Sequence, residues 1–263
     1  MTWTDAEWKQ NQNFLYTGNS SSGSLESPAK RVITCPTSRR PAFLAPGRAR
    51  QGADVSSIRE RNRDLILRAA SEEFAEKGFA GTKMSDIAAK AGLPKPNVYY
   101  YFKSKENLYR EVLESIVEPL LQASAPFNQA GHPHEVLTAY IRSKIRISRD
   151  LPYASKVFAS EIMHGAPHLS QEQTEHLNLQ AKHNIECIQG WIDQGLMAKV
   201  DPHHLLFSIW AATQTYADFD WQISTVTGKP SLSEADYDAA AETIIRLVIK
   251  GCEVEEKVSA KSA

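Results

Sequence analysis

The chain has 263 residues, of which 42% are hydrophobic and 9% aromatic, and a formal net charge of -1 at pH 7. This composition is typical of a folded protein with about two domains and excludes a globally disordered chain. No apolar run of about 18 residues and no leader pattern is present, so we expect a cytoplasmic protein without membrane contact. The three cysteines, Cys35, Cys187 and Cys252, have neither disulfide nor zinc spacing, so we expect no metal or other cofactor.

Charge is unevenly divided along the chain. Lys and Arg outnumber Asp and Glu by 7 to 4 in residues 1–56 and by 11 to 7 in residues 57–110, whereas residues 111–263 have 12 against 20. A basic half followed by an acidic remainder is compatible with a nucleic-acid reader joined to a sensing or assembly domain. Many unrelated proteins share this asymmetry, so a functional assignment depends on the sequence motifs.

The two ends of the chain differ in composition from the rest. Residues 1–54 are rich in Ser, Gly, Pro, Asn and Arg and have no apolar period, which predicts a disordered arm. Two interpretations stay open, a basic arm that contacts DNA phosphates and an extension that is not part of the native protein. Residues 252–263 are expected to form a disordered tail.

A helix-turn-helix is predicted after this arm. Apolar residues recur at helical spacing from Ser57 to a C-cap at Gly78, which indicates a first helix. A short second helix is expected between an N-cap at Thr82 and Gly92, and a third over Lys95–Tyr101, with prolines only at its entrance. The third helix of such a unit enters the major groove of DNA.

The rest of the chain is expected to be helical as well. Ser104 caps a long fourth helix, and no strand or internal repeat is apparent. The predicted fold is all-α with about nine helices, a three-helix DNA-binding domain over 55–103 and a ligand-binding and dimerisation domain over 104–251. The remaining helices are expected over residues 134–149, 152–163, 169–194, 202–226 and 233–251.

The third helix has side chains suited to DNA. Lys95 can donate to guanine or phosphate, Asn97 can pair with adenine or phosphate, and Pro96 offers an apolar surface to a thymine methyl. The run of three tyrosines and a phenylalanine that follows cannot all face DNA, because the three-helix unit needs a core. We expect Val98 and Phe102 to pack in the core and Tyr100 and Tyr101 to face the DNA. For Tyr99 both positions stay open.

The block FAEKGFAGTKMSDIAAKAGLPKPNVYYYFKSKENL, residues 74–108, resembles the DNA-binding signature of the TetR family of one-component repressors. The resemblance implies a homodimer that binds a near-palindromic operator and is released by a small-molecule inducer. Pro94 departs from the pattern, since relatives often have a capping Ser or Thr there. By motif position, DNA contacts fall on Thr82, Lys83, Ser85, Lys95, Pro96, Asn97, Tyr99, Tyr100, Tyr101 and Lys105.

The C-terminal half has a narrower resemblance, to pyrimidine-responsive regulators within this family. It rests on YIRSKIRISRDLPYASKVF at residues 140–158 and IWAATQTYADF at residues 209–219, and it implies an inducer such as uracil or thymine. The stretch Pro119 to Gln122 lacks the tryptophan that such relatives have at an aromatic wall.

A ligand site is expected on the helix after Pro202. Trp210, Gln214, Ala217 and Trp221 recur on one helical face, and a glutamine amide on an apolar face is costly unless it is paired. A planar base would pair with Gln214 and stack on Trp210 or Tyr216. Phe158, Glu161 and Met163 are candidates for the opposite wall, with plain core packing as the equal alternative.

Other assignments remain open for the C-terminal half. Trp210 and Trp221 could instead lie in a dimer interface, with Gln214 paired across it. The ligand could belong to another class, or the bundle could be solid, as in a ligand-free architectural DNA-binding protein. No catalytic motif is present, so an enzyme is not expected. Dimerisation is expected through the last two helices, using Leu205, Ile209, Ile244, Ile245, Leu247 and Val248.

Overall fold

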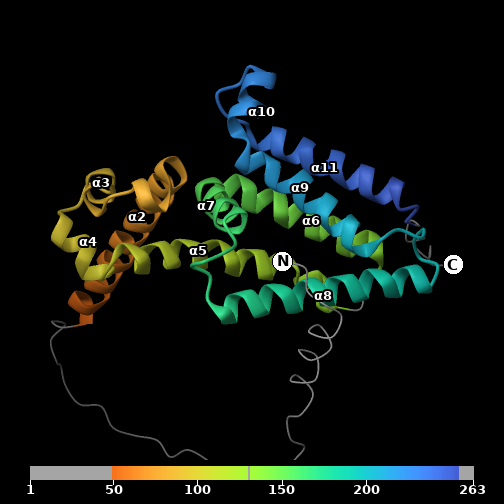
Figure 1. Cartoon of the computed structure of the whole chain (residues 1–263), viewed down its shortest axis with the longest axis horizontal. Coiled ribbons are helices and arrows are strands. Elements are labelled where there is room, and N and C mark those ends of the chain that lie inside the picture. The colour runs from red at the N-terminus through yellow and green to blue at the C-terminus, as the bar shows by residue number, and fades with distance from the viewer. Residues whose placement is uncertain (1–48, 130, 255–263) are drawn as a thin grey trace, which may run out of the picture. The chain divides into compact units, whose positions relative to one another are not determined.

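The computed structural model describes residues 49–129 and 131–254, with side-chain surroundings from residue 58 onward. Over these ranges the protein is all-α, with ten α-helices, one short 3-10 helix and no strand (Figure 1). The expectations for residues 1–48 and 255–263 lie outside them. The helices are α2 (Ala49–Gly81), α3 (Met84–Lys90), α4 (Lys95–Tyr101), α5 (Lys105–Ala123), η1 (Ala125–Asn128), α6 (Pro133–Asp150), α7 (Pro152–Met163), α8 (Gln171–Asp193), α9 (Pro202–Asp218), α10 (Asp220–Thr227) and α11 (Glu234–Gly251).

Local side-chain caps begin several helices where the sequence predicted them. The Ser104 hydroxyl accepts a hydrogen bond from the Asn107 N–H at 3.1 Å, which starts α5. The Asp201 carboxylate accepts from the N–H groups of His203 and His204 at 2.8 and 3.2 Å, which starts α9. Ser233 and Asp236 form a capping box at α11.

Three boundaries differ from the sequence predictions. Helix α2 begins at Ala49, before the expected start at Ser57, and it has a kink at Gly78, where φ is 68°. The single helix expected over 202–226 is wrong, because the backbone leaves helical geometry at Phe219 (φ -120°, ψ 38°) and α10 starts separately. The Asp220 carboxylate accepts from the Trp221 N–H at 2.8 Å, a local bond that favours a new start over continuation.

The predicted tail also begins too early. Cys252 and Val254 are buried in the C-terminal core, and the Cys252 carbonyl accepts from the Ala198 N–H at 2.8 Å. These contacts fasten the end of α11 to the loop after α8. No helix in the described ranges has both the length and the apolar character needed to cross a bilayer.

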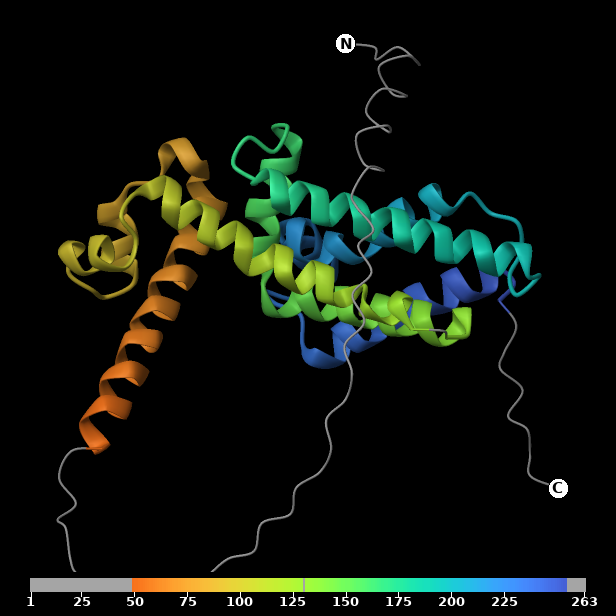
Figure 2. The same ribbon diagram turned by 90° about the horizontal axis from the view of Figure 1, so that it is seen from below.

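Two hydrophobic cores meet along α5. The first core joins α2, α3, α4, the start of α5 and Val157 of α7. The second joins the end of α5 to α6, α8, α9 and α11. Figures 1 and 2 both show α5 running from the α2–α4 group into the larger group of helices. Because the first core includes Leu108, Val112 and Leu113, it extends beyond the predicted boundary at residue 103.

Candidate DNA-binding and ligand-binding sites

The turn between α3 and α4 sets the direction of the predicted recognition helix. Gly92 ends α3 with φ at 66°, a conformation that side-chain-bearing residues rarely adopt. Pro94 offers no capping side chain, but its carbonyl accepts from the Asn97 N–H at 2.9 Å. Pro96 removes one of the N–H groups that would otherwise lack a partner in the first turn. The loss of the hydroxyl cap is therefore compensated by backbone geometry.

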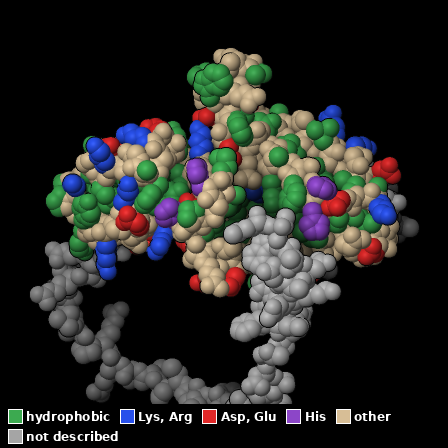
Figure 3. Space-filling model, in the orientation of Figure 1, with side chains coloured by type: hydrophobic (Ala, Val, Ile, Leu, Met, Phe, Trp, Pro, Cys, Tyr) green, Lys and Arg blue, Asp and Glu red, His purple; other side chains and the backbone are tan. Residues whose placement is uncertain are grey.

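Helix α4 presents one face to the core and another to solvent. Val98 and Phe102 are buried, as predicted. Lys95, Pro96 and Asn97 are exposed. Figure 3 shows basic side chains on the surface of the α2–α4 part of the molecule. The exposed first turn matches the part of a recognition helix that reads base edges.

The three tyrosines of α4 are divided between surface and core differently from the prediction. Tyr100 is 70% exposed and lies under the Arg59 guanidinium, 5.9 Å from its ring centre. Tyr99 is also exposed, with the Lys95 ammonium 5.8 Å from its ring centre. Tyr101 is half-buried against the first core, so Tyr99 and Tyr100, rather than Tyr100 and Tyr101, are the exposed pair.

Two of the predicted DNA-contact residues form hydrogen bonds with backbone carbonyls of the protein itself. Thr82 is buried, and its hydroxyl donates to the carbonyls of Glu73 and Gly78 at 3.0 and 2.8 Å. These bonds leave the hydroxyl unexposed, which speaks against the predicted DNA contact. Its predicted role as N-cap of α3 is wrong, because Lys83 holds that position. The Lys105 ammonium donates to the carbonyls of Phe79 and Thr82 at 2.8 and 3.1 Å, which holds the segment before α3 against α5.

A stability measurement separates Thr82 from its exposed neighbour Ser85. We expect Thr82→Val to lower the free energy of unfolding in urea by about 1–3 kcal/mol, because buried carbonyls lose their donor. Ser85→Ala removes an exposed hydroxyl and should change that free energy by less than about 0.5 kcal/mol. Wild-type stability of Thr82→Val together with weakened DNA binding would contradict this structural role.

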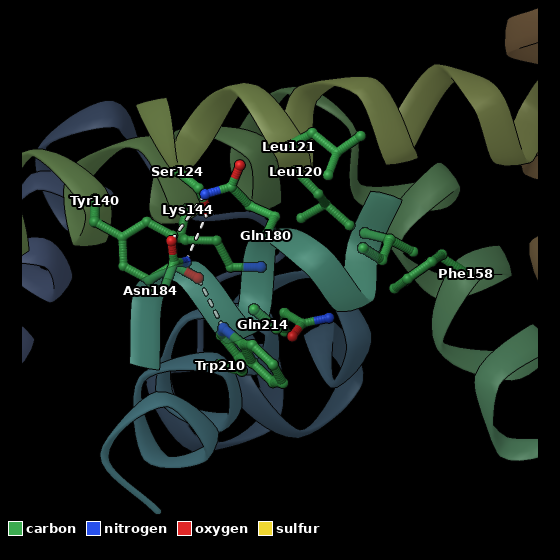
Figure 4. A pocket seen from close by; sticks show the side chains of 12 residues that line it. Leu120, Leu121, Ser124, Tyr140, Lys144, Phe158, Gln180, Asn184, Trp210 and Gln214 are labelled. Atoms are coloured by element: carbon green, nitrogen blue, oxygen red, sulfur yellow. Dashed lines mark hydrogen bonds between the residues drawn. The ribbon is translucent and has the colours of Figure 1, made fainter. Parts of the chain in front are cut away.

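A pocket lies inside the C-terminal group of helices (Figure 4). Its volume is about 130 Å³, and α5, α6, α7, α8 and α9 all contribute side chains. The predicted residues Trp210, Gln214 and Phe158 line it. The other lining residues are Leu120, Leu121, Ser124, Tyr140, Lys144, Leu177, Gln180, Ala181 and Asn184.

Most polar groups of the pocket are already paired. The Trp210 indole N–H donates to the Tyr140 hydroxyl at 2.7 Å, which holds the indole ring in place. Burial raises the pKa of Tyr140 to about 12, so this phenol stays neutral. The Gln180 amide donates to the Asn184 carbonyl oxygen at 2.9 Å, and the Asn184 amide donates to Ser124 at 3.1 Å. For Gln214 no hydrogen-bond partner is found within the described part of the chain.

The pocket also contains a buried cation. Lys144 is 5% exposed, and no hydrogen bond or salt bridge joins its ammonium to another residue within the described ranges. Burial lowers the pKa of Lys144 to about 8, against the opposing attraction of Asp218. The Asp218 carboxyl is itself held by the Ser155 hydroxyl at 2.7 Å, and burial raises its pKa.

Four residues proposed near the ligand lie elsewhere. Met163 is 77% exposed, and Trp221 is exposed on α10 because of the break at Phe219. Tyr216 packs against Tyr237, with ring centres 6.3 Å apart, and does not line the pocket. Glu161 accepts from the Tyr109 hydroxyl at 3.0 Å and from the His168 N–H, in a buried cluster outside the pocket.

Lys144 has a recognisable signal in the sequence that the predicted site did not include. Tyr140, Lys144 and Ser148 recur at four-residue spacing on the same face of α6 as Leu137 and Ile141. A lysine in the middle of an apolar stripe is rarely buried without a reason. Ser124 and Asn184 had no comparable signal, since their neighbours in the sequence are a loop and a polar helix face.

Two family models match successive parts of the chain. Residues 66–112 match the family of bacterial regulatory proteins of the tetR type, and residues 113–255 match the C-terminal region of YcdC-like proteins. The chain is 41% identical over 186 residues to the HTH-type transcriptional regulator RutR of Escherichia coli K12, covering 71% of this chain and 88% of RutR. It is 31% identical to the HTH-type transcriptional repressor NicS of Pseudomonas putida, covering 43% of this chain and 54% of NicS.

Solved structures share the same fold. The ketosteroid transcriptional regulator KstR2 of Mycobacterium tuberculosis superposes with a TM-score of 0.61 at 19% identity, covering 74% of this chain and 95% of KstR2. AibR in complex with isovaleryl coenzyme A and operator DNA superposes with a TM-score of 0.52 at 18% identity, covering 71% and 97%. The two family matches, the RutR similarity and the helix-turn-helix together show that the chain belongs to the TetR family of DNA-binding transcriptional regulators.

Proposed function

We propose that the protein is a dimeric repressor that leaves its operator when a pyrimidine base such as uracil or thymine enters the pocket. The volume supports a single small ring, because an apolar cavity of about 150 Å³ holds benzene and this pocket has about 130 Å³. Trp210 and Phe158 provide ring surfaces, and the Gln214 amide, which has no partner among the described residues, can both donate and accept. These groups suit a flat ring with alternating N–H and C=O groups.

The observation that carries the proposal is that the same helices build the pocket and the DNA-binding core. Helix α5 contributes Leu120 and Leu121 to the pocket and Leu113 to the first core. Helix α7 contributes Phe158 to the pocket and the adjacent Val157 to that core. A ligand that displaces these side chains moves the helices that support α2, α3 and α4, which couples the pocket to the operator.

The alternatives fit the pocket less well. A ligand of another class, such as the coenzyme A thioester bound by AibR, is far larger than a cavity of about 130 Å³. A ligand-free architectural protein would fill this space with apolar side chains, since empty space and unpaired buried polar groups are costly. Gln214 and Lys144 line the cavity instead.

Operator release tests the proposal directly. We expect fluorescence anisotropy of an operator, selected by the purified protein from random-sequence DNA, to fall when uracil or thymine is added. Gln214→Ala should retain operator binding and lose release, because the base then lacks its amide partner. Gln222→Ala, at an exposed position on α10, should respond as wild type. Operator binding that neither base weakens would refute the pyrimidine proposal and leave the DNA-binding assignment intact.

A further inference from the structure

Lys144 is a buried cation whose ammonium donates to no other residue within the described ranges. Removing an ammonium from water is unfavourable unless it is paired, and groups with shifted pKa values gather at functional sites. Lys144 lines the pocket, and Figure 4 shows its side chain extending from α6 toward Gln214. Its position leaves it available to a molecule inside the cavity.

We propose that Lys144 determines which ring the pocket accepts, selecting a ring with an oxo oxygen at the ammonium and rejecting one with an amino group there. This inference rests on the proposed function, because it names the chemistry of a ligand of the same pocket. A lysine ammonium has three donors and no acceptor. An oxo oxygen accepts from it, whereas an amino group would place N–H against N–H and leave both unpaired.

The other polar groups of the pocket are poorer candidates for this distinction, because they pair with one another or can rotate. The Gln214 amide can rotate to present either its oxygen or its nitrogen. Asn184 already uses its oxygen for Gln180 and its nitrogen for Ser124. The Tyr140 hydroxyl accepts from Trp210 and also interacts with the Ser124 side chain, so protein groups hold it on both sides. Uracil and cytosine differ by one oxo or amino group and a ring proton, and we assign the discrimination between them to Lys144, the pocket group that can only donate.

The charged surroundings of Lys144 predict a dependence on pH. The other titratable groups that face it are Tyr140 on its own helix and Asp218 on α9, while the lining residues from α5, α7 and α8 are uncharged. With a pKa of about 8 in the free protein, Lys144 is protonated at lower pH. An oxo oxygen favours the ammonium and raises this pKa further. Uracil affinity should therefore be constant below pH 8 and fall above it, by up to tenfold per pH unit.

Direct ligand binding tests the inference independently of operator release. Calorimetry would compare uracil, cytosine and hydantoin, a five-membered cyclic imide, on the wild type, on Lys144→Met and on Lys182→Met, an exposed control on α8. We expect uracil to bind the wild type and the control at least tenfold more tightly than cytosine. In Lys144→Met the preference and the loss of affinity above pH 8 should disappear, with uracil weakened by roughly 10–100-fold.

The outcomes distinguish this inference from the proposed function. Lys144→Met should fold, because an apolar side chain of similar length replaces a buried charge, and operator binding without ligand would confirm its integrity. An unchanged uracil preference in Lys144→Met, or no preference in the wild type, overturns the role of Lys144 even if uracil releases the operator. If hydantoin binds through Lys144 and no pyrimidine does, the pyrimidine proposal fails and the role of Lys144 stands. Absence of binding by all three rings overturns both.

Discussion

Replacing Lys95 and Asn97 together by alanine should abolish specific operator binding. Both side chains project from the exposed first turn of α4, while Val98 and Phe102 anchor the opposite face. Loss of a side chain that contacts a base edge typically costs about 1–3 kcal/mol, and a dimer loses it at both half-sites. Two side chains at two half-sites sum to about 4 kcal/mol or more, so we expect operator affinity to fall by about a thousandfold or more, measured by anisotropy at fixed salt concentration.

A matched control separates the loss of contacts at α4 from the loss of a surface lysine elsewhere. Lys199→Ala removes an exposed lysine after α8, outside the helix-turn-helix, and should bind the operator within about twofold of wild type. Sedimentation and circular dichroism should be unchanged in both proteins, since neither substitution reaches a core. Near-wild-type operator affinity of the double variant would remove α4 from the recognition surface.

Leu247→Asp should dissociate the dimer and weaken operator binding. Three of the six residues predicted for the interface, Ile209, Ile244 and Ile245, are buried in the core of the chain itself, so that part of the prediction is wrong. The opposite faces of α9 and α11 expose Phe207 at 50% and Leu247 at 68%. Two copies that bury these faces would form a four-helix bundle, the expected arrangement for a symmetric dimer.

The expected effect on DNA follows from linkage of the two half-sites. A second recognition helix raises the apparent affinity by about 10²–10⁴ when it is held in place, and a monomer loses this gain. Met163→Asp is the matched control, because Met163 is also apolar and largely exposed, at 77%, but lies on α7. Sedimentation should show monomer for Leu247→Asp and dimer for Met163→Asp. A Leu247→Asp protein that stays dimeric with full operator affinity would place the interface elsewhere.

The helix-turn-helix was predictable from the sequence because its determinants are local. The positive φ of Gly92, the prolines at the entrance of α4 and the buried pair Val98 and Phe102 all fall within eleven residues. Helix starts at Ser104 and Asp201 were predictable for the same reason, since a cap joins residues only two or three positions apart. The sequence by itself thus determined the fold class, most helix ends and the exposed first turn of the recognition helix.

The membership of the pocket was decided only by the tertiary structure. Periodicity correctly placed Trp210 and Gln214 on one face, but the break at Phe219 directs Trp221 away, and helix crossings leave Tyr216 and Met163 outside. Lys144 and Asn184 come together from α6 and α8, which no local pattern connects. A helical period identifies which residues share a face, whereas the packing of five helices determines which part of that face borders a cavity.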